Sequence, residues 1–113
     1  MDKRKQYKFS IPIRPKSKGR PRVTRNGTYT PKATRDYEAA VRSYYKGPKF
    51  EGPVSMSISL SPKRAVVTIT EIDVEVSPLR GDISNYVKGI EDALNGIAYD
   101  DDKQIHKLTG KKK

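Results

Sequence analysis

Two strand patterns in the middle of the chain set the strongest limit on its fold. Across residues 54–60, apolar side chains alternate with serines, and this period of two predicts a strand with one buried face. Residues 65–76 are rich in β-branched side chains, which favour strands, and only the short segment 61–64 separates the two runs. We therefore expect a β-hairpin, with a bulge or a change of face where the apolar phase shifts between Ile69 and Ile72.

Segments before this hairpin predict another strand and a helix. Residues 7–13 alternate between apolar and more polar side chains, and Pro12 places this strand at an edge or marks its end. After Thr34, apolar residues recur with helical spacing as far as Tyr44, and Thr34 is expected to cap this helix.

A second helix is expected after the hairpin, from about Ser84 or Asn85 to Leu94. Asn95 and Gly96 follow it directly, and both residue types tolerate the left-handed backbone with which helices often end. The chain is therefore expected to turn back on itself after this helix.

The order of these elements indicates an α/β fold of the α+β type. We expect a small mixed β-sheet with two main helices packed on it, in a single domain over residues 1–113. Residues 104–108 are expected to add a last strand. The basic tail, residues 109–113, is expected to be disordered and solvated.

The composition suits a small domain that gains from a second copy. Of the 113 residues, 34% are apolar and 33% are charged, so a monomer buries only a modest core and a homodimer is expected. The absence of cysteine excludes disulfides and thiolate metal sites. No apolar run is long enough for a signal peptide or a membrane span, so we expect a cytoplasmic protein with no membrane partner.

The charge of the chain favours nucleic acid as its partner. Lys and Arg number 24 against 13 Asp and Glu, a formal net charge of +11, and such a surface attracts phosphate backbones through counterion release. Many of the cations lie in a loop, residues 14–33, which can form a short hairpin around residues 26–27. The loop is either a phosphate-contacting arm or an indifferent solvated segment. Its candidate contacts are Lys16, Lys18, Arg20, Arg22 and Arg25.

Acidic residues gather in one part of this basic chain. Asp82 precedes the second predicted helix and Asp100, Asp101 and Asp102 follow it, so a chain reversal after the helix could bring the two groups together. Carboxylates from separate segments suit Mg²⁺, which prefers hard oxygen ligands and keeps several waters. Such an ion would contact a phosphate of the substrate, and Lys88 would supply a cation toward that phosphate. The alternative is an acidic solvated turn with Lys88 as a surface residue.

The same segment, together with the basic loop, resembles the RusA family of Holliday junction resolvases. Residues 18–38 are similar to the family's basic loop and first helix, and the resemblance spans most of residues 7–105. The motif residues occur in the family's order from Asp82 to Ile105. They are Asp82, Ser84, Asn85, Lys88, Asp92, residues 93–96, Asp101, Asp102 and Gln104.

The resemblance implies a small homodimeric α/β nuclease that uses Mg²⁺ or Mn²⁺ to nick two opposed strands of a four-way DNA junction symmetrically. It implies that Asp82 and Asp102 are metal-binding catalytic carboxylates and that Lys88 is the catalytic lysine, also close to DNA. Asp101 is a further metal candidate, or a residue that orients the loop or the metal-bound water. Since such proteins act in DNA recombination and repair, a nucleoid-associated location in the cytoplasm is implied, and a phage or prophage origin is plausible.

Ser84 separates this chain from the family's usual pattern, which has a second aspartate at this position. A serine is a poor ligand for a hard divalent ion, and Ser84 is expected to cap the second helix instead. Another acid, Asp92 or Asp101, could then supply the missing carboxylate. A non-catalytic protein that binds junctions or other branched DNA on the same fold is therefore the alternative function.

Overall fold

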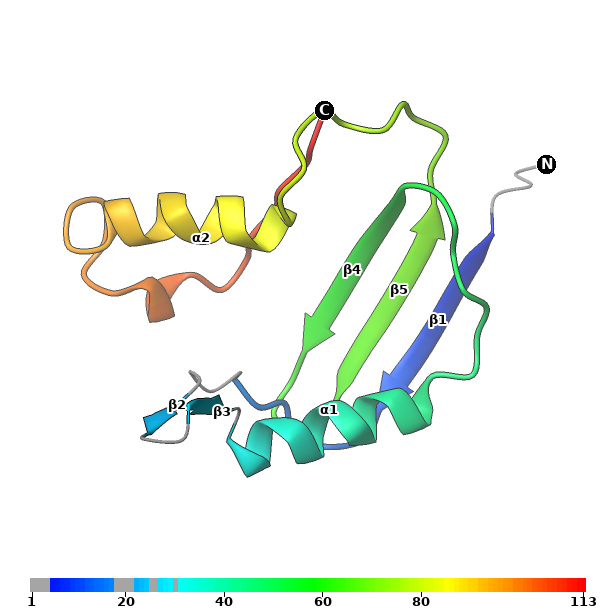
Figure 1. Cartoon of the computed structure of the whole chain (residues 1–113), viewed down its shortest axis with the longest axis horizontal. Helices are drawn as coiled ribbons and strands as arrows, with labels where there is room; N and C mark the ends of the chain where they lie inside the picture. The colour runs from blue at the N-terminus through cyan, green and yellow to red at the C-terminus, as the bar shows by residue number, and fades with distance from the viewer. Residues whose placement is uncertain (1–4, 18–21, 25–26, 30) are drawn as a thin grey trace. The chain divides into compact units, whose positions relative to one another are not determined.

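The computed structural model describes residues 5–17, 22–24, 27–29 and 31–113. These residues form two compact units, the first ending at Asp73 and the second comprising Val74–Lys113 (Figure 1). The strands and helices of the first unit are β1 (Gln6–Ile11), β2 (Arg22–Thr24), β3 (Gly27–Tyr29), α1 (Lys32–Tyr44), β4 (Val54–Leu60) and β5 (Ala65–Glu71). The second unit contains α2 (Ile83–Leu94) and a short 3₁₀ helix, η1 (Asp102–Gln104).

A three-stranded sheet forms the first unit, in the order β1-β5-β4 (Figure 1). The hairpin predicted from the two central strand patterns is confirmed as β4 and β5, and β1 pairs with the other edge of β5. The predicted α+β class is confirmed, with this sheet and two helices. The prediction of a mixed sheet is wrong, because both pairings are antiparallel. The predicted bulge is also absent, since β5 ends at Glu71 before the apolar phase shifts.

The register of the sheet explains where the core lies. Ile11 on β1 is opposite Ala65 on β5, and Ala65 is opposite Leu60 on β4, so these three side chains share one face. Ile11 is only 2% exposed, while Leu60 at the β4 edge is 68% exposed. Val41 of α1 packs against the buried cluster. The core is therefore centred on β1 and β5, and β4 presents an uncovered apolar row at the sheet edge.

Helix α1 begins earlier than Thr34, which was predicted to cap it. Pro31 occupies the N-cap position with φ −55° and ψ 146°, and its carbonyl accepts hydrogen bonds from the backbone N–H of Thr34 and Arg35. A proline suits a helix start because its fixed φ is compatible with entry into the helix. Thr34 is instead a buried residue inside the helix.

The loop between β1 and α1 contains the expected hairpin. Strands β2 and β3 pair antiparallel, with Thr24 opposite Gly27. Gly27 has φ +117°, a backbone conformation that favours glycine. This confirms the short hairpin predicted around residues 26–27.

The second unit is organised around α2, which begins at Ile83 rather than at Ser84 or Asn85. Gly96 has φ +81°, so the predicted left-handed residue is present, whereas Asn95 keeps φ −62°. The predicted strand over residues 104–108 is wrong, because the chain forms η1 there and then continues without regular structure. Among the described residues, no helix is long and apolar enough to cross a membrane.

Candidate active site

Lys88 lies between two carboxylates of the second unit, those of Asp92 and Asp102. Its Nζ is 3.1 Å from Oδ2 of Asp102 and 3.3 Å from Oδ1 of Asp92. Asp92 follows Lys88 by one helical turn on α2, while Asp102 comes from η1. The structure therefore brings together two of the residues predicted for catalysis, Lys88 and Asp102, and adds Asp92.

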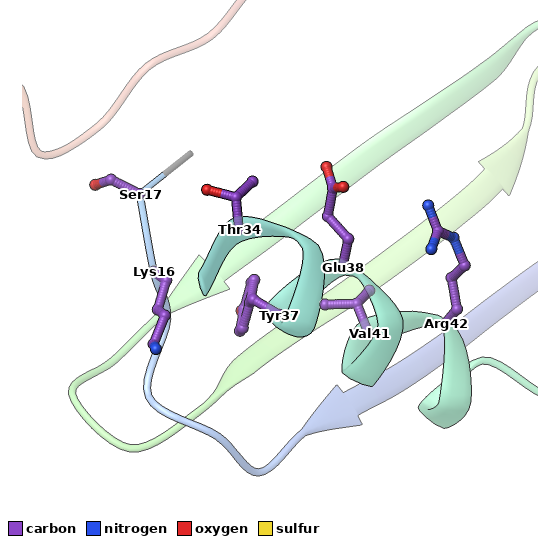
Figure 2. A pocket seen from close by; sticks show the side chains of 7 residues that line it. All are labelled: Lys16, Ser17, Thr34, Tyr37, Glu38, Val41 and Arg42. Atoms are coloured by element: carbon purple, nitrogen blue, oxygen red, sulfur yellow. The ribbon is translucent and has the colours of Figure 1, made fainter. Parts of the chain in front are cut away.

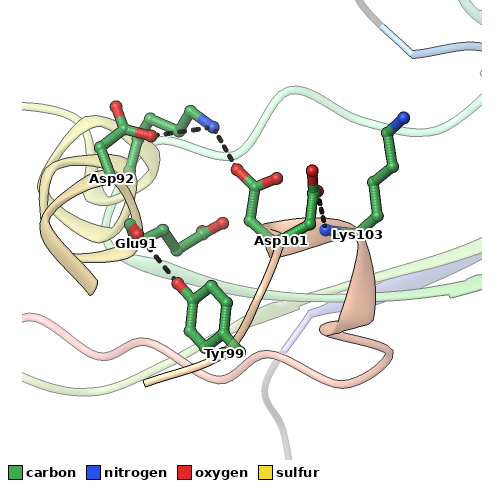
Figure 3. A network of polar contacts seen from close by, with 7 residues as sticks. Glu91, Asp92, Tyr99, Asp101 and Lys103 are labelled. Carbon is green, nitrogen blue, oxygen red and sulfur yellow. Dashed lines mark hydrogen bonds and ion pairs between the residues drawn. The ribbon is translucent and has the colours of Figure 1, made fainter. Parts of the chain in front are cut away.

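The segment after α2 is folded back by contacts near Gly96. The backbone N–H of Gly96 donates to the carbonyl of Tyr99 at 2.7 Å, which closes a tight turn. The Tyr99 hydroxyl then donates to the backbone carbonyl of Glu91 at 2.9 Å (Figure 3). Tyr99 thus attaches the turn to the helix, and the chain after this turn places Asp102 within hydrogen-bond distance of Lys88. The sequence analysis missed this role, because a tyrosine in a loop carries no specific signal.

Asp101 and Gln104 hold η1 in place through a capping box. Asp101 Oδ1 accepts a hydrogen bond from the backbone N–H of Lys103 at 2.9 Å, and Gln104 Oε1 accepts from the backbone N–H of Asp101 at 3.0 Å. Gln104 also accepts from the backbone N–H of Asp100 at 2.6 Å. Asp101 therefore orients the loop, which was one of the roles predicted for it. Its Oδ1 is already used as the acceptor of this capping hydrogen bond.

Asp82 stands at the start of α2, apart from the Lys88 cluster. It is the N-cap residue, and its backbone carbonyl accepts from Asn85 and Tyr86, but its side chain makes no capping hydrogen bond. With a rise of about 1.5 Å per residue, Lys88 lies about 9 Å further along the helix axis. Ser84 lies within the helix, so the prediction that it caps α2 is wrong.

The tail after residue 108 contacts the segment that precedes Asp82. Lys112 Nζ donates to the backbone carbonyls of Leu79 and Gly81, at 3.3 and 3.1 Å. A side-chain atom added at Gly110 would approach Val87 to 3.0 Å, so the tail backbone passes close to α2. The prediction of a disordered tail is therefore wrong, because these contacts attach it to the segment before Asp82, while its residues are solvent-exposed as predicted.

The contacts of Lys88 determine the electrostatics of the cluster. The hydrogen bond and positive charge of Lys88 lower the pKa of Asp102, whose side chain is 26% exposed. Reciprocally, the hydrogen bonds to Asp102 and Asp92 raise the pKa of Lys88. Burial raises the pKa of Tyr99, with a further contribution from the charge of Glu91. Asp102 is thus held as a carboxylate and Lys88 as an ammonium.

Replacing Lys88 with methionine is expected to raise the pKa of Asp102 toward its ordinary value, because the ammonium that favours the carboxylate is lost. In the native protein, the stabilisation from this contact is present above the ordinary aspartate pKa of about 3.9 and is lost as the pH falls through the lowered value. A carbon-13 NMR titration of the carboxyl groups in metal-free protein measures the shift. Lys103→Met is the control, and an unchanged Asp102 titration in Lys88→Met would contradict the assigned cause.

The carboxylates of this unit fit a divalent cation by their chemistry but not as a closed cage. Among the described residues, no group of three or more Asp, Glu or His side chains is arranged to hold a metal ion. Asp82 has a carboxylate free of capping, and Asp102 uses one oxygen for Lys88. Mg²⁺ commonly binds through one or two carboxylates together with waters and substrate phosphates. These hard oxygen donors therefore suit an ion that is completed by the substrate.

The predicted DNA-contacting residues are only partly described. Lys18, Arg20 and Arg25 lie outside the described residues, and for Arg22 only its place in β2 is described. Lys16 is exposed and lines a hollow of about 370 Å³ against α1. Figure 2 shows Lys16 and Ser17 beside α1, whose residues Thr34, Tyr37, Glu38, Val41 and Arg42 line the rest of the hollow. Lys16 and Arg42 place two cations beside this hollow.

A strongly basic α+β protein with a lysine held between one exposed and one half-buried carboxylate belongs, by its chemistry, with proteins that act on phosphate backbones. The comparison with protein families identifies this one: residues 12–113 match the family described as Endodeoxyribonuclease RusA. The chain therefore belongs to the RusA family of endodeoxyribonucleases, as its motif residues predicted, and this membership supports nuclease activity and implies Holliday junction resolvase activity in broad terms.

One relative is the uncharacterized protein YqaN of Bacillus subtilis (strain 168). It is 32% identical to this chain over 114 residues, which cover 87% of this chain and 80% of YqaN. No solved structure matches the chain. The functional assignment therefore depends on the family and on the residues of the site.

Proposed function

We propose that this protein is a metal-dependent, structure-selective endodeoxyribonuclease that resolves four-way DNA junctions by paired symmetric nicks, in recombination and repair. The observation that carries the proposal is the contact of Lys88 with Asp102 inside the segment that places the chain in the RusA family. A surface that only binds DNA does not require a lysine and a carboxylate from different elements to be brought together by a turn.

Asp82 and Asp102 are the proposed ligands of Mg²⁺ or Mn²⁺, with Asp101 as a further candidate whose capping oxygen is already in use. When bound, such an ion supplies a Lewis acid for a phosphate oxygen and lowers the pKa of a coordinated water. Lys88 directs its ammonium at the negative charge that develops on the phosphate. The Lys88 contact favours the ionised form of Asp102, which is the form that a metal ion binds, while Lys88 and the ion share this carboxylate.

Contacts to the DNA backbone are proposed for the basic segment before α1, namely Lys16, Lys18, Arg20, Arg22 and Arg25, together with Lys88. Lys16→Gln is expected to lower the slope of log affinity against log salt by about 0.9 for duplex arms, because one phosphate contact is lost. A fluorescence anisotropy titration of a junction at several salt concentrations measures this slope. Lys63→Gln removes the same charge from the turn between β4 and β5. An equal change in both variants would contradict a specific role for Lys16.

A homodimer is the proposed assembly, because a two-fold dimer offers two equivalent sites to two equivalent strands of a junction. The exposed apolar row on β4, from Val54 to Leu60, supports a need for further coverage of the sheet. Light scattering after gel filtration measures the mass in solution. A monomer at concentrations that cleave junctions would contradict this assembly.

The second candidate function is junction or branched-DNA binding without cleavage. It is favoured by Ser84 in place of an acid. Under this alternative, the basic segment would bind junctions tightly and salt-sensitively, and Asp102 would serve only to hold Lys88.

Cleavage of a labelled synthetic four-way junction distinguishes the two functions. The protein is incubated with the junction or with a linear duplex of the same sequence, in Mg²⁺, in Mn²⁺ and in chelator. The nuclease function predicts metal-dependent nicks at symmetric positions in two opposed strands of the junction and none in the duplex. Junction binding without nicks under every metal condition would establish the second function instead.

A further inference from the structure

Lys88 contacts two carboxylates whose positions are fixed in different ways. Asp102 reaches Lys88 through the turn that Tyr99 ties to the helix, whereas Asp92 stands one turn along the same helix. The pairing of Lys88 with Asp92 therefore depends only on the regular geometry of α2. Asp92 is also 61% exposed, so its carboxylate stays hydrated while it faces the ammonium.

In the proposed function, Asp102 contacts two cations, the Lys88 ammonium and the divalent metal ion. A divalent ion on Asp102 withdraws negative charge from the contact with Lys88, and it repels the ammonium across a short distance. Before the phosphate binds, Lys88 therefore needs an anionic partner that is not itself a metal ligand in order to keep its ammonium at the active site. Asp92 meets this need, because it already lies 3.3 Å from Lys88 Nζ.

We propose that Asp92 is a positioning residue that retains Lys88 at the active site when Asp102 binds the metal. The proposal rests on the proposed function, and it assigns to Asp92 a role distinct from that of an ordinary surface ion pair. An ordinary pair would stabilise the helix slightly and leave both metal affinity and reaction rate unchanged.

The proposal predicts that Asp92 acts only through Lys88. Asp92→Asn leaves Lys88 with Asp102 alone, so the ammonium competes harder with the metal for that carboxylate. Mg²⁺ binding is expected to weaken by about 3- to 10-fold, and nicking at saturating Mg²⁺ to slow by about 10-fold, as is typical of coupled residues in contact. Lys88→Ala removes the competitor, and Mg²⁺ binding is expected to tighten. In that background, Asp92→Asn should have no further effect.

The test is a double-mutant cycle of Asp92→Asn and Lys88→Ala with two readouts. Calorimetry on the DNA-free protein gives the Mg²⁺ dissociation constant, and single-turnover nicking of a four-way junction gives the rate. Glu91→Gln is the matched control, because Glu91 neighbours Asp92 with the same charge but contributes its backbone carbonyl to the described network. Asp92→Glu, which restores a carboxylate, should recover part of both quantities.

Two results would overturn the proposal: an equal effect of Asp92→Asn with and without Lys88, or an effect no larger than that of Glu91→Gln. If the native protein binds Mg²⁺ but nicks no junction, the proposed function fails, while the Mg²⁺ affinities still decide the role of Asp92. If the native protein binds no Mg²⁺ at millimolar concentrations, the positioning role is overturned together with the metal site.

Discussion

Replacing Lys88 with alanine is expected to slow junction cleavage by about 100- to 1,000-fold, the cost typical of removing one group that stabilises charge in a transition state. Lys88 Nζ donates a hydrogen bond to Asp102 Oδ2, and the alanine variant has no ammonium group to make this contact. Single-turnover cleavage of a labelled junction in Mg²⁺ measures the rate, and anisotropy in chelator measures binding.

Lys103→Ala is the matched control for this experiment. Lys103 lies on η1 next to Asp102, and its described contact with Asp101 is made by the backbone N–H, which alanine retains. Cleavage by Lys103→Ala is expected to stay within a few-fold of the native rate. If Lys88→Ala and Lys103→Ala cleaved equally fast, Lys88 would be a surface residue rather than part of the active site.

Replacing Gly47 with alanine is expected to destabilise the first unit by about 1–3 kcal/mol, the usual cost of inserting an atom into a packed site. A methyl group at Gly47 would approach the ring of Tyr7 to 2.7 Å. Tyr7 cannot yield freely, because its ring stacks with Phe9 and meets Tyr45 edge-on at a centroid distance of 5.1 Å. Thermal unfolding followed by circular dichroism measures the loss.

Gly52→Ala is the control for this stability prediction. A methyl group at Gly52 has nothing within 4 Å, so its effect is expected to be small. An equal melting temperature for the two variants would contradict the close packing of Gly47, in the segment after α1, against Tyr7 of β1. Both variants retain the second unit unchanged, so any loss can be assigned to the first.

Local sequence patterns predicted the elements of this fold that depend on local physics. The alternating apolar residues of β4 and the β-branched run of β5 predicted the hairpin, since both the period and the side-chain preference of strands were satisfied there. The helical spacing that predicted α1 and α2 was equally informative. The motif from Asp82 to Gln104 predicted the RusA family, which the family comparison confirms.

Predictions that depended on a choice among competing local signals were less successful. Thr34 was a plausible cap by residue type, but Pro31 begins the helix and Thr34 is buried. The segment after Asp101 was predicted to lead into a strand, although Asp101 and Gln104 have the spacing of a capping box and form one. Attention to that spacing would have identified η1 from the sequence.

In the candidate site, too, some features could be predicted from residue types and others depend on the folded chain. Its acidic residues were predictable because they stood out from a basic chain, and the resemblance to the RusA family implied the role of Lys88. Lys88 and Asp102 do meet. The turn that joins them depends on Tyr99, and the tail is held through Lys112, both by hydrogen bonds to backbone carbonyls. Such contacts are set by the folded chain, so residue type alone could not predict them.

The most direct test of the proposed function compares the native protein with Asp102→Asn on a labelled four-way junction in Mg²⁺, with the cut positions mapped on each strand. The proposal predicts paired symmetric nicks by the native protein that disappear in chelator and in Asp102→Asn, while both proteins bind the junction. Cleavage by Asp102→Asn at the native rate, or binding by the native protein without any nick, would contradict it.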